Sequence, residues 1–528
     1  MGFAVAIIVA AAAGFIALSY EILWYRVISY ASWGLPGAFG LLLAAYLFGL
    51  AIGSRVAGAF CKDKQAEGDK STLRKLAAFT FFANLVAWLV VPCFGWSSKK
   101  YDWPPALLAV AIAAALLGAI LPLVAHFGIK PDDKAGQKLS YVYLSNIIGS
   151  SAGSLVTGFV FLDVMKLQQI GALIACLGMV LVAALMFLSD AQGTTRAAGL
   201  IVPLIAGGVF VKATPVAYDR IWERLQYKQA FDEENTRFKD VVETKSGVIA
   251  VTQQGFVYGG GAYDGKVNVS IRGDVNGIFR AYGVGAMHPN PKNVLMIGLA
   301  TGAWAQVVAN MDKVEHMTVV EINPGYLELI AKYDEVKSLL KNPKVDIQID
   351  DGRRWLNRNP DRKFDFIVMN TTWNWRAHST NLLSVEFLNL ARAHMNKGGI
   401  LYYNTTSSDD VKKTAATVFP HSLRVWNFVA VSDDPFEWNK ERWLDLLHTM
   451  KIDGEPVART YPDDEDDRKW WKEQAEFPDT VNGPFDDEAL ESGKSMLARA
   501  DQAGAVVITD DNMAPEWRKV IRFQDPPH

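Results

Sequence analysis

The sequence predicts a chain of two kinds of structure, a multi-span α-helical membrane domain and a soluble α/β domain with a small β-rich region before it. Two observations predict this division. Long apolar segments are confined to the first 214 residues, although the whole chain of 528 residues is only 50% hydrophobic. Beyond residue 290, short apolar runs alternate with helix-length segments, which is typical of a parallel sheet covered by helices.

The membrane domain is predicted from segment length. Seven apolar segments approach the roughly 20 residues that a helix needs to cross a bilayer, at residues 3–20, 34–54, 76–96, 104–126, 141–162, 167–188 and 197–214. The seventh is the weakest, because Lys212 and Pro215 interrupt its end. The small residues of Gly149–Ser154 would allow two helices to pack closely. The alternative is a soluble protein with several buried core helices.

A strand–turn–helix–strand unit opens the α/β domain. The apolar run from Val294 ends in the glycine turn Gly298-Leu-Ala-Thr-Gly302, and a second run ends in Glu321, 23 residues after Gly298. Glycines let a backbone approach a ligand, and an acid at about this spacing binds ribose hydroxyls in nucleotide-binding units. The unit predicts a Rossmann-like nucleoside site, with an ordinary α/β turn as the alternative.

Three further predicted strands lead toward the same site. They are Val345–Ile349, Phe364–Met369 and Ile400–Tyr403, and the first two are followed by Asp351 and Asn370. The carboxyl ends of parallel strands meet at one edge of a sheet, so these side chains should lie near the glycine turn. We expect a nucleoside-type cofactor to be bound by Gly298, Thr301, Gly302, Glu321, Asp351 and Gly352.

The expected domain organisation follows from these segments. A transmembrane domain of about seven helices covers residues 1–214, a linker and β-hairpin region covers 215–290, and a nucleoside-binding domain with a C-terminal extension covers 291–528. Within that extension, the acidic run Asp463–Asp467 is interpreted as a solvated loop, with contact to a basic partner as the alternative.

These motifs resemble the spermidine synthase family, which has a methyltransferase-like Rossmann domain. The resemblance lies in the glycine turn, Val-Val-Glu321-Ile-Asn, Asp351-Gly352 and Phe-Asp365-Phe-Ile, and it covers roughly residues 240–520. The hairpin-like run from Val241 to Val251 precedes them. Two further segments, Ala17–Arg26 in the first helix and Thr509–Asn512 near the end, are similar to the membrane-fused members of the family.

The resemblance implies roles for single residues. Glu321 would hold the ribose and Asp351 the adenine of decarboxylated S-adenosylmethionine or its thioether product. The expected cofactor is S-adenosylmethionine or decarboxylated S-adenosylmethionine. However, Thr301 stands where the family has an acid that grips an aminopropyl ammonium group, and Asn370 and Trp373 replace its catalytic Asp-x-x-Asp pair. Aminopropyl transfer needs a carboxylate that holds and helps deprotonate the attacking amine. These substitutions argue against ordinary polyamine synthesis.

The segment after the fourth strand has two interpretations. Asn370 and Trp373 loosely resemble the Asn-Pro-Pro-aromatic loop of amine- and amide-methylating enzymes, although both prolines are absent, and they would then be the catalytic residues that orient an acceptor. Alternatively, Asn370 and Thr371 only complete the hydrogen bonds of a turn. Four tryptophans in this domain also have two interpretations, since they could stack on a ligand or fill the core. These are Trp304, Trp355, Trp373 and Trp375.

Three functions are compatible with these features. The leading one is a membrane-anchored transferase that moves an aminopropyl or methyl group from an S-adenosylmethionine-type cofactor to an amine or amide. The second is a catalytically inactive fold that serves as a scaffold or binding subunit of a membrane assembly, with protein partners there. The third is a solute carrier. The eight scattered histidines and the net charge of −3 favour neither a metal site nor nucleic acid as a partner.

We expect an integral protein of a bacterial inner membrane, in contact with lipid, but two observations disagree about the side of its soluble domain. The loops after the second, fourth and sixth segments carry ten Lys and Arg residues, against four in the opposite loops. By the positive-inside rule the amino terminus is inside, so seven spans would put the soluble domain outside. An adenosyl cofactor is made in the cytoplasm, which favours the opposite side.

Overall fold

The structure is a computed structural model, which describes residues 2–61, 71–102, 104–370, 373–461, 463–477, 490–513 and 516. The chain forms two compact units. The first contains the residues up to Phe238 together with Glu243–Val248, and the second contains Lys239–Val242 and the residues from Ile249 onward.

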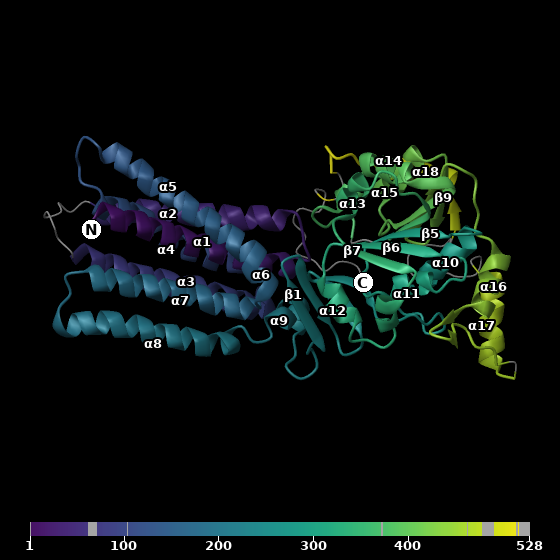
Figure 1. Cartoon of the computed structure of the whole chain (residues 1–528), viewed down its shortest axis with the longest axis horizontal. Coiled ribbons are helices and arrows are strands. Elements are labelled where there is room, and N and C mark those ends of the chain that lie inside the picture. Colours follow the sequence, from purple (N-terminus) through teal and green to yellow (C-terminus); the bar gives the residue numbers. More distant parts are fainter. Residues whose placement is uncertain are drawn as a thin grey trace. The chain divides into compact units, whose positions relative to one another are not determined.

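The first unit is helical (Figure 1). Its long helices are α1 (Phe3–Ala31), α2 (Gly37–Phe60), α3 (Ser71–Tyr101), α4 (Leu107–Gly128), α5 (Ala135–Val156), α7 (Leu167–Leu188) and α8 (Gly193–Ala217). Short elements join or follow them, namely η1 (Pro104–Ala106), the π-helical η2 (Thr157–Phe161), α6 (Leu162–Val164), α9 (Ile221–Tyr227) and η3 (Lys228–Ala230). By length and composition, seven helices in the described part of the chain could cross a membrane, one for each predicted segment.

Close helix packing in this unit depends on glycine. A Cβ atom added to Gly149 of α5 would lie 1.9 Å from the carbonyl oxygen of Ala11 in α1, and one added to Gly153 would lie 2.3 Å from that of Phe15. The two backbones can therefore approach only where a side chain is missing, which confirms the interpretation of the Gly149–Ser154 segment. Nearby, the Thr157 hydroxyl donates to the Ser19 hydroxyl at 2.9 Å.

A small antiparallel sheet precedes the α/β fold, as predicted. Its strands are β1 (Asp240–Thr244), β2 (Gly247–Val251), β3 (Phe256–Gly259) and β4 (Ala262–Lys266), paired in that order. The β3–β4 turn needs glycine, since Gly260 and Gly261 have φ values of 56° and 83°. Helix α10 (Phe279–Met287) leads from this sheet to the large one.

The large sheet has eight strands in the order β14-β10-β11-β9-β8-β5-β6-β7. The parallel strands are β5 (Asn293–Ile297), β6 (His316–Glu321), β7 (Val345–Ile349), β8 (Phe364–Met369) and β9 (Met395–Asn404), which confirms all five predicted strands. The antiparallel extension was not predicted and consists of β10 (His421–Val425), β11 (Phe428–Ser432) and β14 (Leu490–Ser492). The second unit is thus a Rossmann-like fold with a mixed sheet.

Helices cover both faces of this sheet (Figure 1). One face packs on α10, α11 (Ala303–Ala309), α12 (Gly325–Ile330) and α16 (Lys440–Thr449), and the other on α13 (Gly352–Arg358), α14 (Val385–Ala393), α15 (Asp409–Val418) and α18 (Gly493–Gln502). Strand β5 shows why both faces are apolar: Val294 and Met296 pack in one core, Leu295 and Ile297 in the other. The remaining elements are η4 (Lys337–Lys341), η5 (Ser379–Leu382), β12 (Lys451–Ile452), β13 (Glu455–Pro456) and α17 (Glu465–Glu476).

The acidic run Asp463–Asp467 is exposed as predicted except at Asp467, but it forms the start of a helix and not a loop. Asp464 caps the amino terminus of α17, which begins at Glu465. The Asp467 side chain is buried and pairs with Arg272. The pair agrees with the alternative interpretation of a basic partner, whose identity could not be predicted because Arg272 lies 195 residues away in the sequence.

Candidate functional site

The candidate site lies where the strand order of the large sheet reverses. Strand β5 has β6 on one side and β8 on the other, so the connections that leave β5 and β8 diverge at their carboxyl ends. In open α/β sheets ligands bind at such a point. The predicted residues Gly298, Glu321 and Asn370 all follow or end these three strands.

The glycine turn after β5 adopts a backbone that its two glycines permit. Gly298 and Gly302 have φ values of 92° and 78°, which other residues rarely adopt. A Cβ atom on Gly302 would also lie 2.7 Å from Cδ1 of Ile330. The turn is closed by a hydrogen bond from the Gly302 N–H to the Leu299 carbonyl at 2.9 Å.

Glu321 holds this turn in place. One carboxylate oxygen accepts the Leu299 N–H and the other accepts the Asn323 N–H, both at 2.7 Å. The residue is only 4% exposed. Burial raises the pKa of Glu321 to about 7, although the backbone N–H donors lower it. The Ala300 N–H is a third backbone donor to this carboxylate, which thus joins the ends of β5 and β6 and keeps acceptor capacity for a ligand.

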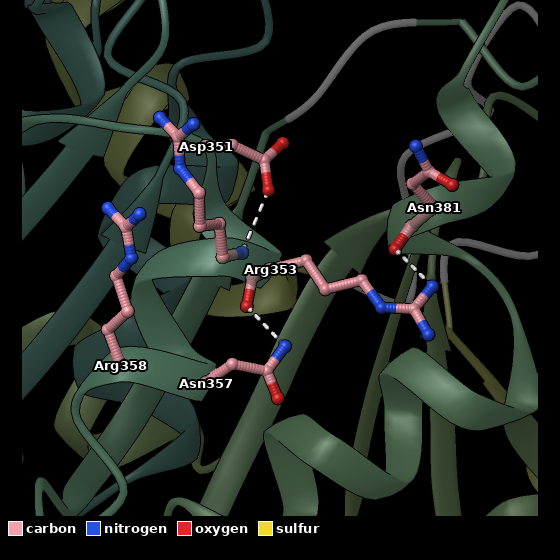
Figure 2. A pocket seen from close by; sticks show the side chains of 6 residues that line it. Asp351, Arg353, Asn357, Arg358 and Asn381 are labelled. Carbon is pink, nitrogen blue, oxygen red and sulfur yellow. Dashed lines mark hydrogen bonds between the residues drawn. The ribbon is translucent and has the colours of Figure 1, made fainter.

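Asp351 caps the next helix at the edge of an open pocket. Its carboxylate accepts the Arg354 N–H at 2.8 Å. The pocket has a volume of about 500 Å³, and its lining residues are Asp351, Arg353, Arg354, Asn357, Arg358 and Asn381. Figure 2 shows Arg353 reaching across from α13 to the Asn381 carbonyl. The Asp350 N–H donates to the Glu321 carbonyl at 3.0 Å, so this pocket borders the end of β6.

Thr301 is buried rather than open to the site. It is 4% exposed, and its hydroxyl accepts the Ala303 N–H at 3.3 Å. A Cβ atom on Gly265 of β4 would lie 3.4 Å from the Thr301 methyl group, so β4 covers the turn here. A neutral hydroxyl in this position offers no charge to an ammonium group.

Asn370 and Trp373 contact different elements. The Asn404 amide approaches Asn370 Oδ1 at 3.5 Å, whereas the Trp373 indole N–H donates to the Tyr263 carbonyl of β4 at 3.2 Å. Trp373 also stacks on Trp375, with ring centroids 6.0 Å apart. Thr371, which the turn interpretation invokes, lies outside the described residues.

Two of the candidate stacking tryptophans are core residues. Trp304 and Trp355 are 6% and 7% exposed and belong to the two apolar clusters on opposite faces of the sheet. Trp304 stacks on Phe428 at 5.1 Å. The core interpretation is therefore confirmed for these two.

A polar cluster at the site was not found from the sequence. Asp264 of β4 accepts a hydrogen bond from the Tyr326 hydroxyl, and Arg376 lies against the β3–β4 turn, where a Cβ atom on Gly260 would be 2.7 Å from its guanidinium. Burial raises the pKa of Asp264 to about 6, while the tyrosine hydrogen bond and Arg376 lower it. No local motif marks Asp264, because its partners come from distant segments. Among the described residues, no group of three or more His, Cys, Asp or Glu side chains could hold a metal ion.

The comparisons with known proteins match this part of the chain. The family described as "Spermine/spermidine synthase domain" matches residues 282–422. Polyamine aminopropyltransferase 2 of Hyperthermus butylicus is 29% identical over 190 residues, which are 32% of this chain and 62% of the relative. The polyamine aminopropyltransferase of Thermococcus kodakarensis is 32% identical over 146 residues, 25% of this chain and 50% of the relative. The match therefore spans less than two thirds of either relative.

Solved structures give a distant likeness. Spermidine synthase from Thermotoga maritima has 17% sequence identity and a TM-score of 0.34, with 46% of this chain and 88% of that chain covered. Human methyltransferase-like protein 13 in complex with SAH has 16% identity and a TM-score of 0.24, with 29% and 80% covered. The glycine turn, Glu321 and Asn370 all lie within residues 282–422, the part of the chain that is similar to the spermine/spermidine synthase domain.

Proposed function

We propose that this protein is a membrane-anchored transferase that binds an S-adenosylmethionine-type cofactor and moves its methyl or aminopropyl group to an amine or amide. The observation that carries the proposal is the Glu321 carboxylate, which is buried at the switch point of the sheet and bonded to the glycine turn. A carboxylate held there can accept both ribose hydroxyls, while the turn gives a ligand access to backbone.

The proposed reaction is a displacement at carbon. The bond from the sulfonium sulfur to the transferred carbon breaks and leaves a neutral thioether, as a bond forms from that carbon to the acceptor nitrogen. The nitrogen also loses a proton. Asn370 and Trp373 carry no group that is basic near neutral pH, so this proton passes to water and the acceptor must be a nitrogen that is already uncharged.

Titration calorimetry of the full chain in detergent tests the proposal. We expect saturable binding of at least one of S-adenosylmethionine, its decarboxylated form and methylthioadenosine. Absence of binding by all three would contradict it. That result would favour the second candidate, an inactive scaffold, which the neutral, covered Thr301 already suits.

The pH dependence of binding should follow the Glu321 carboxyl. Its pKa in the folded protein is about 7, and an ionised carboxylate accepts hydroxyl hydrogen bonds more strongly than a neutral one. We expect adenosyl ligands to bind about tenfold more tightly at pH 8 than at pH 6, a difference of about 1.4 kcal/mol. Titrations at both pH values check this. The affinity of the Glu321→Gln variant, which has no carboxyl group to ionise at this position, should be the same at pH 6 and pH 8.

The stability of the ligand-free protein should change with pH in the opposite direction to the affinity, falling as the pH rises. Because folding raises the Glu321 pKa above its ordinary value, the protonated carboxyl stabilises the folded state at low pH. That contribution is complete below about pH 4.5 and is lost as the pH rises through about 7. Rising affinity together with falling apo stability would identify Glu321. A parallel change in both would contradict the assignment.

A further inference from the structure

A chain of side-chain hydrogen bonds ends at Asn370. It starts at Arg280 on α10, whose Nη1 donates to Asn427 Oδ1 at 2.5 Å. The Asn427 amide donates to Asn404 Oδ1 at 3.1 Å, and the Asn404 amide points to Asn370 Oδ1 at 3.5 Å, the longest link. This amide chain, Arg280–Asn427–Asn404–Asn370, therefore joins α10 to the carboxyl ends of β9 and β8.

The direction of the amide chain is fixed by two groups that can only donate. A guanidinium has no acceptor, so Asn427 must turn its oxygen to Arg280. The backbone N–H of Thr406 donates to Asn404 Oδ1 at 2.7 Å, so Asn404 must turn its amide nitrogen to Asn370. The Asn370 oxygen is thereby engaged, and its two N–H groups bond no other described residue. Asn370 is left as a hydrogen-bond donor.

The guanidinium at the start of the chain also donates to the Gly277 and Asn276 carbonyls, at 2.8 and 3.0 Å, and no acid of the described residues forms an ion pair with it. No carboxylate of a described residue lies within 4.0 Å of the Arg280 guanidinium. The nearby acid Asp274 instead accepts the N–H groups of Ile278 and Phe279 at the start of α10. The Phe428 ring lies 4.9 Å from the guanidinium carbon. Burial lowers the Arg280 pKa, and such a charge favours an anion nearby.

We propose that this end of the site binds a ligand carboxylate, with Asn370 as donor and Arg280 as the source of positive potential. The proposal rests on the proposed function and names its substrate chemistry. A polyamine would meet donors and positive potential where it needs acceptors. The carboxylate could belong to the methionine part of the donor, which S-adenosylmethionine keeps and its decarboxylated form lacks, or to the acceptor.

A first pair of ligands tests whether the carboxylate belongs to the methionine part of the adenosyl cofactor. S-Adenosylhomocysteine carries the carboxylate together with an α-ammonium group, and methylthioadenosine carries neither, so the response of the preference to Asn370→Asp identifies the carboxylate. We expect the wild type to bind the former at least tenfold more tightly. Asn370→Asp replaces the hydrogen-bond-donating amide by an anionic acceptor and should remove this preference. The affinity of the variant for methylthioadenosine should stay within twofold of that of the wild type. Asn290→Asp on the exposed loop before β5 adds the same charge and is the control that should change neither value.

A second pair of ligands tests whether the carboxylate belongs to the acceptor substrate. 4-Aminobutyrate and 1,4-diaminobutane differ in a carboxylate against an ammonium group, and each is titrated with and without saturating methylthioadenosine. If the wild type binds 4-aminobutyrate but not 1,4-diaminobutane, and Asn370→Asp reverses this preference, the carboxylate belongs to the acceptor. Preference for neither carboxylate ligand in the wild type, or no response to Asn370→Asp, would overturn the proposal. If methylthioadenosine still binds, the proposed function survives that result. If no adenosyl compound binds, the proposed function fails separately.

Discussion

Replacing Glu321 by alanine is expected to weaken adenosyl ligands by about 100-fold or more. The proposed site gives the ribose two hydrogen bonds to one carboxylate, and a hydrogen bond to a charged group contributes about 1.5–3 kcal/mol. Loss of both therefore costs about 3 kcal/mol at least, which corresponds to about two orders of magnitude in Kd. Titration of the variant with the ligand that the wild type prefers measures this directly.

The same substitution also disturbs the ligand-free turn, so its control must separate the two effects. The N–H groups of Leu299 and Asn323 lose their acceptor, at a cost of about 1–3 kcal/mol each where they stay buried. Thermal unfolding of the apo variant reports that cost. Glu315→Ala is a suitable comparison, because Glu315 is exposed and its one ion pair with a described residue is to Lys292, just before β5. Unchanged binding in a folded Glu321→Ala variant would remove this carboxylate from the site.

The parallel half of the sheet and Glu321 could be predicted because each depends on neighbours in the sequence. An apolar run followed by a glycine turn specifies a strand and its end, as at Val294–Gly302. The predicted strands that end before or at Glu321, Asp351 and Asn370 placed these three residues at one edge before any contact was known. The antiparallel strands β10, β11 and β14 gave no such signal, since no repeated strand–helix spacing marks them.

The polar side of the site could not be predicted because its partners are far apart. Asp264 meets Tyr326 across 62 residues, and Arg280 meets Asn427 across 147. Asn370 illustrates the consequence. Its residue type allowed either a donor or an acceptor role, and the role is decided by Asn404, whose own orientation depends on a backbone N–H. Spacing along the chain carries no information about that network.

The second large effect is expected in the helical unit, where Gly149→Ala should destabilise the protein by about 1–3 kcal/mol, the range for overpacking. The added Cβ atom would lie 1.9 Å from the Ala11 carbonyl oxygen, far inside contact distance, and that oxygen is backbone that cannot rotate away. Helices α1 and α5 must then separate along their shared face. Thermal unfolding in detergent, followed by the loss of helical circular dichroism, measures the change.

Gly136→Ala provides the matched control on the same helix. A Cβ atom there meets nothing within 4 Å. In a helix interior alanine is a better helix former than glycine by about 0.8–1 kcal/mol, and the gain is smaller in the first turn, where Gly136 lies, so without the steric clash both substitutions should stabilise α5. Stability changes of opposite sign for the two variants would show that the small residue at position 149 permits helix contact and does not serve helix flexibility. Equal stabilisation would mean that α1 and α5 do not touch there in the folded protein, and the close packing assigned to the Gly149–Ser154 segment would be wrong.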